Sequence, residues 1–394
     1  MIRQLLQKEV QEFIKEHERD NPASLALKYR QVAGVDIKPI LEQVHGRQKA
    51  RTKLPQWYRQ EGIVYPSTVS VEQCSSEITA RYKAELLHGD TLVDLSGGFG
   101  VDTFYFSQRF ARVDYIERDP WLCELARHNH GVLGAGVTHH HQDAKAFIRD
   151  LPIKVDAIYV DPARRDMAGK KVFRLEESEP DVAQLLPALL KKADTVLIKT
   201  SPLLDIDLTV NSLKFVSVVH VVSVNNDCKE VLYMTDPSVA RPWIHTINFL
   251  SDGMRQEFSF TREEEKAAHI PMGAPGSYLY ESNASLMKAG AFRIPGEKYG
   301  LKKLHHNTHL YTSDELQPDF PGRKFEIHNV LPPDRKKIRN YLPEMKANVA
   351  TRNFPMTPEA LKKKLGLKDG GDIYLFGITD MQNTKKLLIT TRIA

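Results

Sequence analysis

Apolar residues between positions 91 and 236 occur in short runs that alternate with amphipathic helical segments. The expected strands are 92–95, 113–117, 137–141, 155–160 and 195–199, and the expected helices are 101–110, 120–130, 144–151, 181–191 and 203–211. This alternation predicts an α/β domain with a doubly wound parallel sheet. Two further runs, 215–224 and 231–235, are separated by Asn225-Asn-Asp227. Such a tight connection predicts a closing hairpin and an antiparallel last strand.

The segments on either side of this region follow other patterns. Residues 1 to about 65 carry apolar side chains at helical spacing, which predicts an N-terminal helical region. After position 237, short apolar runs interleaved with one or two helices predict small α+β domains. The expected domains are an N-terminal helical region (1–68), the alternating domain (69–238), a small α+β domain (239–320) and a basic C-terminal domain (321–394).

Charge is distributed unevenly along the chain. The 394 residues carry a net charge of +5, yet residues 321–394 hold 15 lysines and arginines against 7 aspartates and glutamates, a net of +8. The remaining residues are slightly acidic, with a net of −3. A basic block of this kind indicates a polyanionic partner, most simply a nucleic acid. The alternative is a solvated surface without a partner, and charge alone does not separate the two.

Other features of composition exclude several classes of protein. No apolar run reaches membrane-spanning length, and charges within the first ten residues argue against a secretion signal. Cys74, Cys123 and Cys228 are odd in number and scattered, which argues against a disulfide framework and favours a reducing, cytoplasmic setting. We expect no bound metal, because the neighbouring histidines of His139-His-His141 would point to alternate faces of a strand.

The run Thr91-Leu-Val-Asp-Leu-Ser-Gly-Gly-Phe-Gly-Val-Asp102 predicts a nucleotide cradle. It reads as a buried strand, a loop of small residues and the start of a helix near Val101, so that backbone N–H groups can approach a ligand closely. A dinucleotide-binding loop would need a third glycine where Thr103 stands. Asp94, which ends the strand, can hold the ammonium of an amino-acid-bearing nucleoside. The alternative is a tight turn without a ligand.

Three later strands also end in carboxylates, and the carboxyl edge of an α/β sheet is where ligands bind. Glu117, followed by Arg118, is placed to accept both ribose hydroxyls of a nucleotide. Asp143, followed by Ala144, begins a helix and has N-cap chemistry. Asp161 begins the run Asp-Pro-Ala-Arg164. Lys199 ends a further strand, either as a functional cation in the cleft or as a charge emerging at the sheet edge.

These motifs, in their order and spacing over residues 70–236, resemble class I S-adenosylmethionine (SAM)-dependent methyltransferases. The glycine loop resembles motif I, with Ser96 in place of the first glycine. In that family Glu117 would contact the ribose, Asp143 the adenine amino group, and the segment around Gln73 and Ser75 the methionine end. The cofactor contacts that the resemblance implies are Gln73, Ser75, Asp94, Ser96, Gly97, Gly98, Gly100, Glu117, Arg118, Asp143, Ala144 and Asp161.

The run beginning at Asp161 resembles motif IV of enzymes that methylate amino groups of nucleobases, although Ala163 and Arg164 depart from the pattern D/N-P-P-aromatic. The resemblance implies that Asp161 and Pro162 accept hydrogen bonds from the acceptor amine. Methylases of uracil C5 share Asp-Pro-Pro-Arg but need a nucleophilic cysteine after the next strand, where this chain has Lys199-Thr-Ser-Pro202. The expected catalytic residues are Asp161, Pro162, Arg164 and Lys199.

The whole chain resembles a bacterial family in which a methyltransferase domain of Rossmann-like fold precedes ferredoxin-like and THUMP-like domains. THUMP domains bind RNA, so the resemblance implies a SAM-dependent methyltransferase of tRNA or rRNA, acting at a nucleobase nitrogen. A DNA or small-molecule methyltransferase and a non-catalytic nucleic-acid-binding protein are the alternatives. Two basic segments are further candidate RNA contacts: His45–Lys53, otherwise a surface turn, and the connection 164–180, a candidate lid with Phe173 as a base-stacking residue.

Overall fold

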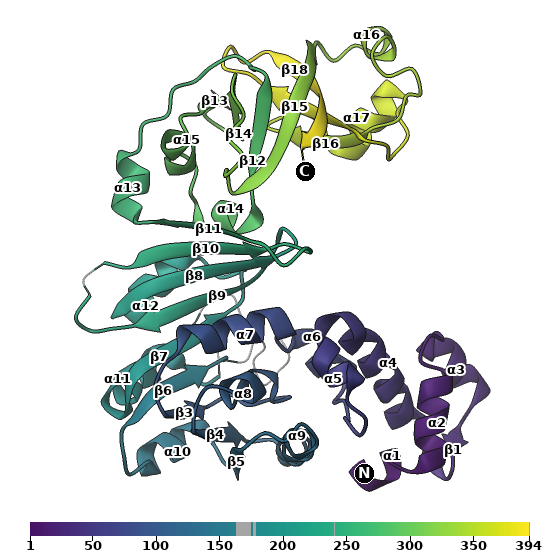
Figure 1. Cartoon of the computed structure of the whole chain (residues 1–394), viewed down its shortest axis with the longest axis vertical. Helices are drawn as coiled ribbons and strands as arrows, with labels where there is room; N and C mark the ends of the chain where they lie inside the picture. Colours follow the sequence, from purple (N-terminus) through teal and green to yellow (C-terminus); the bar gives the residue numbers. More distant parts are fainter. Residues whose placement is uncertain (163–174, 176–178, 240, 394) are drawn as a thin grey trace. The chain divides into compact units, whose positions relative to one another are not determined.

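The computed structural model describes residues 1–162, 175, 179–239 and 241–393, and it divides into two compact units (Figure 1). One unit comprises residues 1–217 and 232–240, and the other comprises residues 218–231 and 241–394. The first contains the N-terminal helices and the parallel strands, and the second contains the remaining β-structure of the C-terminal half.

The N-terminal region is helical, as the sequence predicts. Its helices are α1 (Ile2–Leu5), α2 (Lys8–Glu16), α3 (Pro22–Lys28), α4 (Ile37–Lys53), α5 (Pro55–Arg59) and α6 (Thr68–Gln73), with a small hairpin of β1 (Gln31–Val32) and β2 (Val35–Asp36). The side chains of Asn21 and Asp36 accept backbone hydrogen bonds and begin α3 and α4. The basic stretch 45–53 is the last part of α4 and not a turn, and Arg47 in it pairs with Glu18 at 3.0 Å.

The first unit is built around five parallel strands in the order β7-β6-β3-β4-β5. These are β3 (Thr91–Asp94), β4 (Arg112–Glu117), β5 (Val137–His141), β6 (Val155–Val160) and β7 (Ala193–Thr200). The central strands β3 and β6 are almost entirely buried, which explains their continuous apolar runs. The predicted α/β class with a doubly wound parallel sheet is therefore confirmed.

The helices that alternate with these strands are α7 (Glu77–Leu86), α8 (Val101–Phe106), α9 (Pro120–Val132), α10 (Ala144–Asp150), α11 (Val182–Lys192) and α12 (Ile206–Leu213). The last four begin at aspartate N-caps, whose carboxylates accept hydrogen bonds from the first free backbone N–H groups. Asp119, Asp143 and Asp205 follow their strands within five residues, so these three turns at the carboxyl edge of the sheet are short, whereas Asp181 comes after the long connection that follows β6.

The closing hairpin consists of β8 (Val216–Val224) and β9 (Asp227–Thr235), as the sequence predicts. Asn225 and Asn226 both have left-handed backbone angles, φ 52° and 64°, which match the twist of a two-residue hairpin turn. Strand β10 (Trp243–Phe249) then pairs in parallel with β8, and β11 (Arg255–Phe260) pairs with β10. The sequence analysis expected these two runs in the small α+β domain, but their backbone hydrogen bonds extend the order of the large sheet.

A seven-stranded sheet occupies the rest of the second unit in the order β13-β14-β12-β15-β18-β17-β16. Its strands are β12 (Tyr278–Ser282), β13 (Lys302–His305), β14 (Thr308–Ser313), β15 (Gly322–Leu331), β16 (Asn348–Arg352), β17 (Ile373–Thr379) and β18 (Lys385–Ile393). The ten-residue β15 pairs with β12 on one edge and β18 on the other. The expected domain boundary near residue 320 is thus followed at once by a strand shared between both segments.

The accompanying helices are α13 (Arg262–Ala267), α14 (Ala284–Ala289), α15 (Ile294–Lys298), α16 (Arg335–Arg339) and α17 (Pro358–Leu365). Helix α17 begins with Thr357 as N-cap and Pro358 as the first residue, a favourable pair for a helix start. Sequence analysis missed α13, α15, β13 and β16. Each of these missed elements is short, and short elements carry too little periodicity to be recognised.

Candidate functional site

The loop between β3 and α8 has a conformation that only its glycines permit. Gly98 and Gly100 have left-handed backbone angles, φ 53° and 85°. A Cβ atom on Gly97 would lie 2.1 Å from the ring of Tyr115, and one on Gly100 would lie 2.7 Å from His130. The loop is therefore packed tightly on its protein side, while a Cβ on Gly98 would meet only the Ser96 carbonyl, at 3.7 Å.

A cavity of about 460 Å³ opens beside this loop at the carboxyl edge of the sheet. Every position for which a cofactor contact was expected lines it: Gln73, Ser75, Asp94, Ser96, Gly97, Gly98, Gly100, Glu117, Arg118, Asp143, Ala144 and Asp161. Pro162 lines it as well. The volume and the mixture of backbone, hydroxyl and carboxylate groups fit a nucleoside-sized ligand with several polar ends.

Asp94 is buried, and both of its carboxylate oxygens are occupied within the loop. Oδ2 accepts a hydrogen bond from Thr103 Oγ1 at 2.6 Å, and Oδ1 accepts one from the Ser96 backbone at 3.0 Å. Burial raises its pKa to about 7, although these hydrogen bonds lower it. In this structure Asp94 therefore holds the strand end, the loop and α8 together.

A second carboxylate, Asp102, faces the same cavity from the first turn of α8. Its Oδ2 accepts hydrogen bonds from Ser75 Oγ at 2.7 Å and Tyr159 OH at 2.9 Å, and its Oδ1 lies 3.3 Å from Lys83 Nζ. Burial alone raises the pKa of Asp102, but the charges of Lys83 and Lys199 and the two hydrogen bonds bring it below its ordinary value. Asp102 is thus an ionised carboxylate in the wall of the cavity.

The sequence analysis included Asp102 as the last residue of the glycine-loop run but predicted no function for it. The available signal was an acidic residue in the first turn of the helix that follows the loop, near the positive end of the helix dipole. Its partners Ser75, Lys83 and Tyr159 come from three different elements, so no local pattern connects them.

The carboxylate of Glu117, at the end of β4, is held in place by backbone hydrogen bonds. It accepts hydrogen bonds from the backbone N–H groups of Gly98 at 2.9 Å and Asp119 at 2.8 Å, which places it beside the glycine loop. The next residue, Arg118, pairs with Glu179 at 2.8 Å, and Glu179 also lines the cavity. Asp143 caps α10 through the backbone N–H groups of Lys145 and Ala146, which is the N-cap role that its sequence position predicts.

The expected acceptor residues lie where β6 ends. The backbone N–H of Asp161 donates a hydrogen bond to Ser96 Oγ at 2.6 Å, so the end of β6 is tied directly to the glycine loop. Lys199 on β7 is buried and forms an ion pair with the carboxylate of Asp161, but it does not line the cavity. Lys199 therefore contacts Asp161, which lines the cavity, and does not line the cavity itself. Arg164 and the basic residues of 164–174, with Phe173, lie outside the described residues.

The consecutive histidines on β5 have separate partners. His139 Nε2 lies 2.8 Å from His130 Nδ1, His140 Nε2 lies 2.7 Å from Asp114, and His141 Nε2 lies 3.0 Å from the Arg118 carbonyl. Within the described ranges, no group of three or more histidine, cysteine or acidic side chains is arranged to hold a metal ion. No helix in those ranges is long and apolar enough to cross a membrane.

Comparison with known proteins identifies the parts of the chain. Residues 278–321 match a ferredoxin-like domain model, and residues 322–392 match a THUMP domain-like model. A candidate methyltransferase from Porphyromonas gingivalis W83, known from its crystal structure, is 33% identical, with 98% of each chain covered and a TM-score of 0.87. Uncharacterized SAM-dependent methyltransferases from two Mycobacterium tuberculosis strains, CDC 1551 / Oshkosh and H37Rv, are 24% identical over 310 residues, which cover 76% of this chain and 80% of theirs. The chain belongs to the family of SAM-dependent methyltransferases that carry ferredoxin-like and THUMP-like domains at the C-terminus.

Proposed function

We propose that this SAM-dependent methyltransferase acts on RNA, tRNA or rRNA, and transfers the methyl group to a nucleobase nitrogen. The observation that carries the proposal is the union, in one chain, of the cofactor cavity with a THUMP-like segment of net charge +8. A small-molecule substrate would leave the basic segment without a partner, whereas RNA presents a phosphate for each cation to contact.

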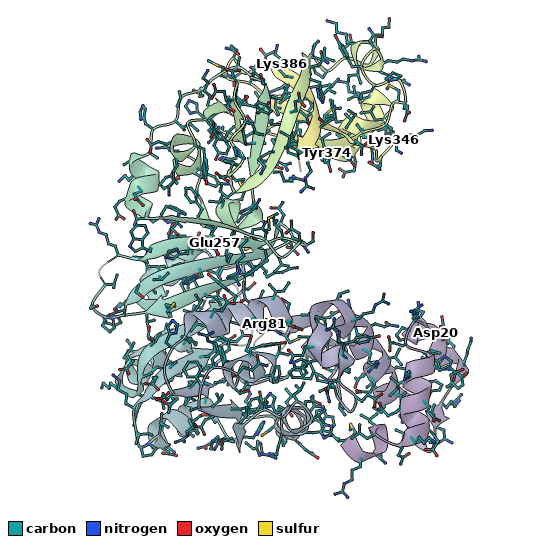
Figure 2. The ribbon with its side chains drawn as sticks, viewed as in Figure 1. Asp20, Arg81, Glu257, Lys346, Tyr374 and Lys386 are labelled. Carbon is teal, nitrogen blue, oxygen red and sulfur yellow. The ribbon has the colours of Figure 1, made fainter. Side chains whose placement is uncertain are left out.

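The basic segment offers a surface suited to a phosphate backbone. Its two helices carry seven cations: Arg335, Lys336, Lys337 and Arg339 on α16, and Lys362, Lys363 and Lys364 on α17. Lys362 pairs with Asp369 at 2.6 Å. Lys346 and Lys386 add further cations to the same segment (Figure 2). Contacts with phosphates position the RNA and do not select its sequence.

The chemistry of the site supports transfer to nitrogen. SAM, when bound, supplies a methyl group already activated for transfer. Asp161 lines the cavity and its carboxylate is a hydrogen-bond acceptor, so it can orient an N–H group of the acceptor base and receive its proton. Lys199 holds this carboxylate in place, and Ser96 fixes its backbone against the cofactor loop. Orientation of this kind is the main contribution that the protein makes.

The proposal is tested by comparing the modified nucleosides of cells with and without the gene by mass spectrometry. We expect one methylated nucleoside to disappear from tRNA or rRNA and to return with the wild-type gene but not with an Asp161→Ala variant. Unmethylated RNA from the deletion strain should then accept radioactive methyl groups from SAM with the purified protein. Methylation of DNA or of the small-molecule fraction, with all RNA nucleosides unchanged, would contradict the proposal.

A further inference from the structure

A second cavity, of about 420 Å³, is lined only by residues of the second unit and shares no lining residue with the cavity beside the glycine loop. Its walls come from α13, from the chain just before α15, and from β13 and β14. Four of its lining residues are cations, namely Arg262, Lys266, Arg293 and Lys303. None of them was singled out by the sequence analysis.

The one carboxylate in the lining, Glu265, is engaged by the backbone. Its two oxygens accept hydrogen bonds from the backbone N–H groups of Phe292, Arg293 and Ile294 at 3.0 to 3.2 Å. Glu265 therefore holds the start of α15, and its single charge cannot balance Lys266, Arg293 and Lys303 together. The cavity therefore keeps an excess of positive charge.

Lys303 is the most informative of the four cations, because it is only 6% exposed. Within the described part of the chain, its ammonium has no hydrogen-bond or ion-pair partner. Burial lowers its pKa, and the nearby Arg293 lowers it further while Glu265 opposes this. The ammonium itself is open to the cavity, so an anion that enters from outside can pair with it and would be stabilised there.

Two aromatic rings complete the cavity. Phe292 and His309 are stacked, with ring centroids 4.1 Å apart, and His309 Nδ1 is buried without a hydrogen-bond partner among the described residues. Burial lowers the pKa of His309 to about 4, so the ring is neutral near pH 7 and one of its nitrogens can donate a hydrogen bond. A cluster of cations with a neutral hydrogen-bond donor in the same lining is suited to a tetrahedral oxyanion.

We propose that this cavity is a phosphate-binding site for the RNA substrate, centred on Lys303. The proposal rests on RNA being the substrate, and it adds a specific contact by the ferredoxin-like domain to the general charge of the THUMP-like segment. The same chemistry would accept the phosphate of a free nucleotide, and the experiment below separates the two sources.

The test uses full-length protein and three substitutions. Lys303→Met removes the buried charge at nearly constant length, and Arg293→Gln removes an exposed cation from the same cavity. The matched control is Lys302→Met: Lys302 neighbours Lys303 on β13, its side chain lies over Gly273, and it does not line the cavity. Binding of unfractionated tRNA and of adenosine 5′-monophosphate is measured over a salt series, with thermal melting of each variant.

We expect Lys303→Met to weaken RNA binding roughly tenfold at low salt, the value of one charge-assisted hydrogen bond. The log–log salt slope should become shallower by roughly 0.7 to 0.9, corresponding to one phosphate contact. Arg293→Gln should act in the same direction, and Lys302→Met should leave affinity and slope unchanged. Lys303→Met should also melt at or above the wild-type temperature, because it removes an unpartnered buried charge.

RNA binding by Lys303→Met and Arg293→Gln at wild-type affinity and slope would overturn the site, even if the protein methylates RNA. Binding of adenosine 5′-monophosphate that both substitutions abolish, with RNA binding unaffected, would assign the cavity to a free nucleotide and overturn the RNA contact. Failure of RNA methylation itself is read separately, from the nucleoside comparison. If Lys303→Met does not fold, Arg293→Gln alone decides, because its side chain is exposed.

Discussion

Replacing Asp161 with asparagine should separate methyl transfer from cofactor binding. The substitution keeps the size of the side chain and the backbone hydrogen bond to Ser96, but it removes the charge that pairs with Lys199 and lines the cavity. The side chain of Asp161 is 27% exposed, whereas that of Lys199 is 2% exposed. The change therefore acts on a carboxylate that faces the cavity and on a lysine that is buried behind it.

Two magnitudes follow from this arrangement. Loss of a preorganised hydrogen-bonding group that is aimed at the reacting centre typically costs about 100-fold to 1,000-fold in rate. Breaking a fully buried ion pair costs about 3–5 kcal/mol, and because Asp161 is partly exposed we expect a smaller loss of stability, about 1–2 kcal/mol. SAM affinity should change little, because asparagine keeps the size of the side chain and the backbone hydrogen bond to Ser96, and a group that acts only in the transition state affects transfer and not ground-state binding.

The assay combines single-turnover transfer from radioactive SAM to RNA, calorimetric SAM binding and denaturant unfolding. Asp156→Asn is the matched control, because Asp156 lies at the other end of the same strand, where its carboxylate accepts hydrogen bonds from Asp90 and Thr91. The control should lose stability but keep transfer. Wild-type transfer by Asp161→Asn, or a loss of SAM binding as large as the loss of transfer, would refute the reasoning.

Three further predictions concern the cofactor loop, the basic segment and acid stability. Gly98→Val should abolish SAM binding in calorimetry, because a backbone φ of 53° is unfavourable for a β-branched residue and the valine side chain would enter the cavity. Native SAM affinity in this variant would contradict the prediction, and so would binding of NAD in place of SAM by the wild-type protein. Replacing all four of Lys336, Lys337, Lys363 and Lys364 by glutamine should make the log–log salt slope of RNA binding shallower by roughly 0.7 per lost phosphate contact and should leave SAM affinity unchanged. An unchanged slope in filter binding would show that these lysines are only solvated surface residues. The pKa of Asp102 is lower in the folded protein than in the unfolded chain, where it is about 4, so the ionised carboxylate stabilises the fold above that pH. This stabilisation is lost as the pH falls through the lower pKa of the folded state. Asp102→Asn should flatten this acid limb in denaturant unfolding between pH 7 and pH 2, and an unchanged pH dependence would show that the carboxylate is not coupled to folding.

The design for the basic segment follows from the fold. Deleting residues 321–394 would be the simplest test from the sequence, since the charge excess begins there. However, β15 pairs with β12 over residues 322–326, so the deletion would remove an inner strand of the sheet and expose the edge of β12. Substitution of exposed lysines removes the charge and leaves the sheet intact.

Local chemistry determined a large part of this protein from the sequence alone. Alternating apolar runs predicted the parallel sheet, because each strand and helix carries its own periodicity. Asp143 marked a helix start, because an N-cap acts within three residues. The glycine loop and the carboxylates that follow successive strands predicted one ligand edge, because the carboxyl ends of parallel strands meet there, and the expected residues do line one cavity.

Only the tertiary structure decided how distant elements combine. The pairing of β10 with β8, and of β15 with β12 and β18, depends on backbone hydrogen bonds, which carry no signature in the sequence of either strand. The ion pair of Asp102 with Lys83, and the cavity around Lys303, likewise join residues from separate elements. A buried charge resembles a surface charge in the sequence, because burial depends on what the rest of the chain places over it.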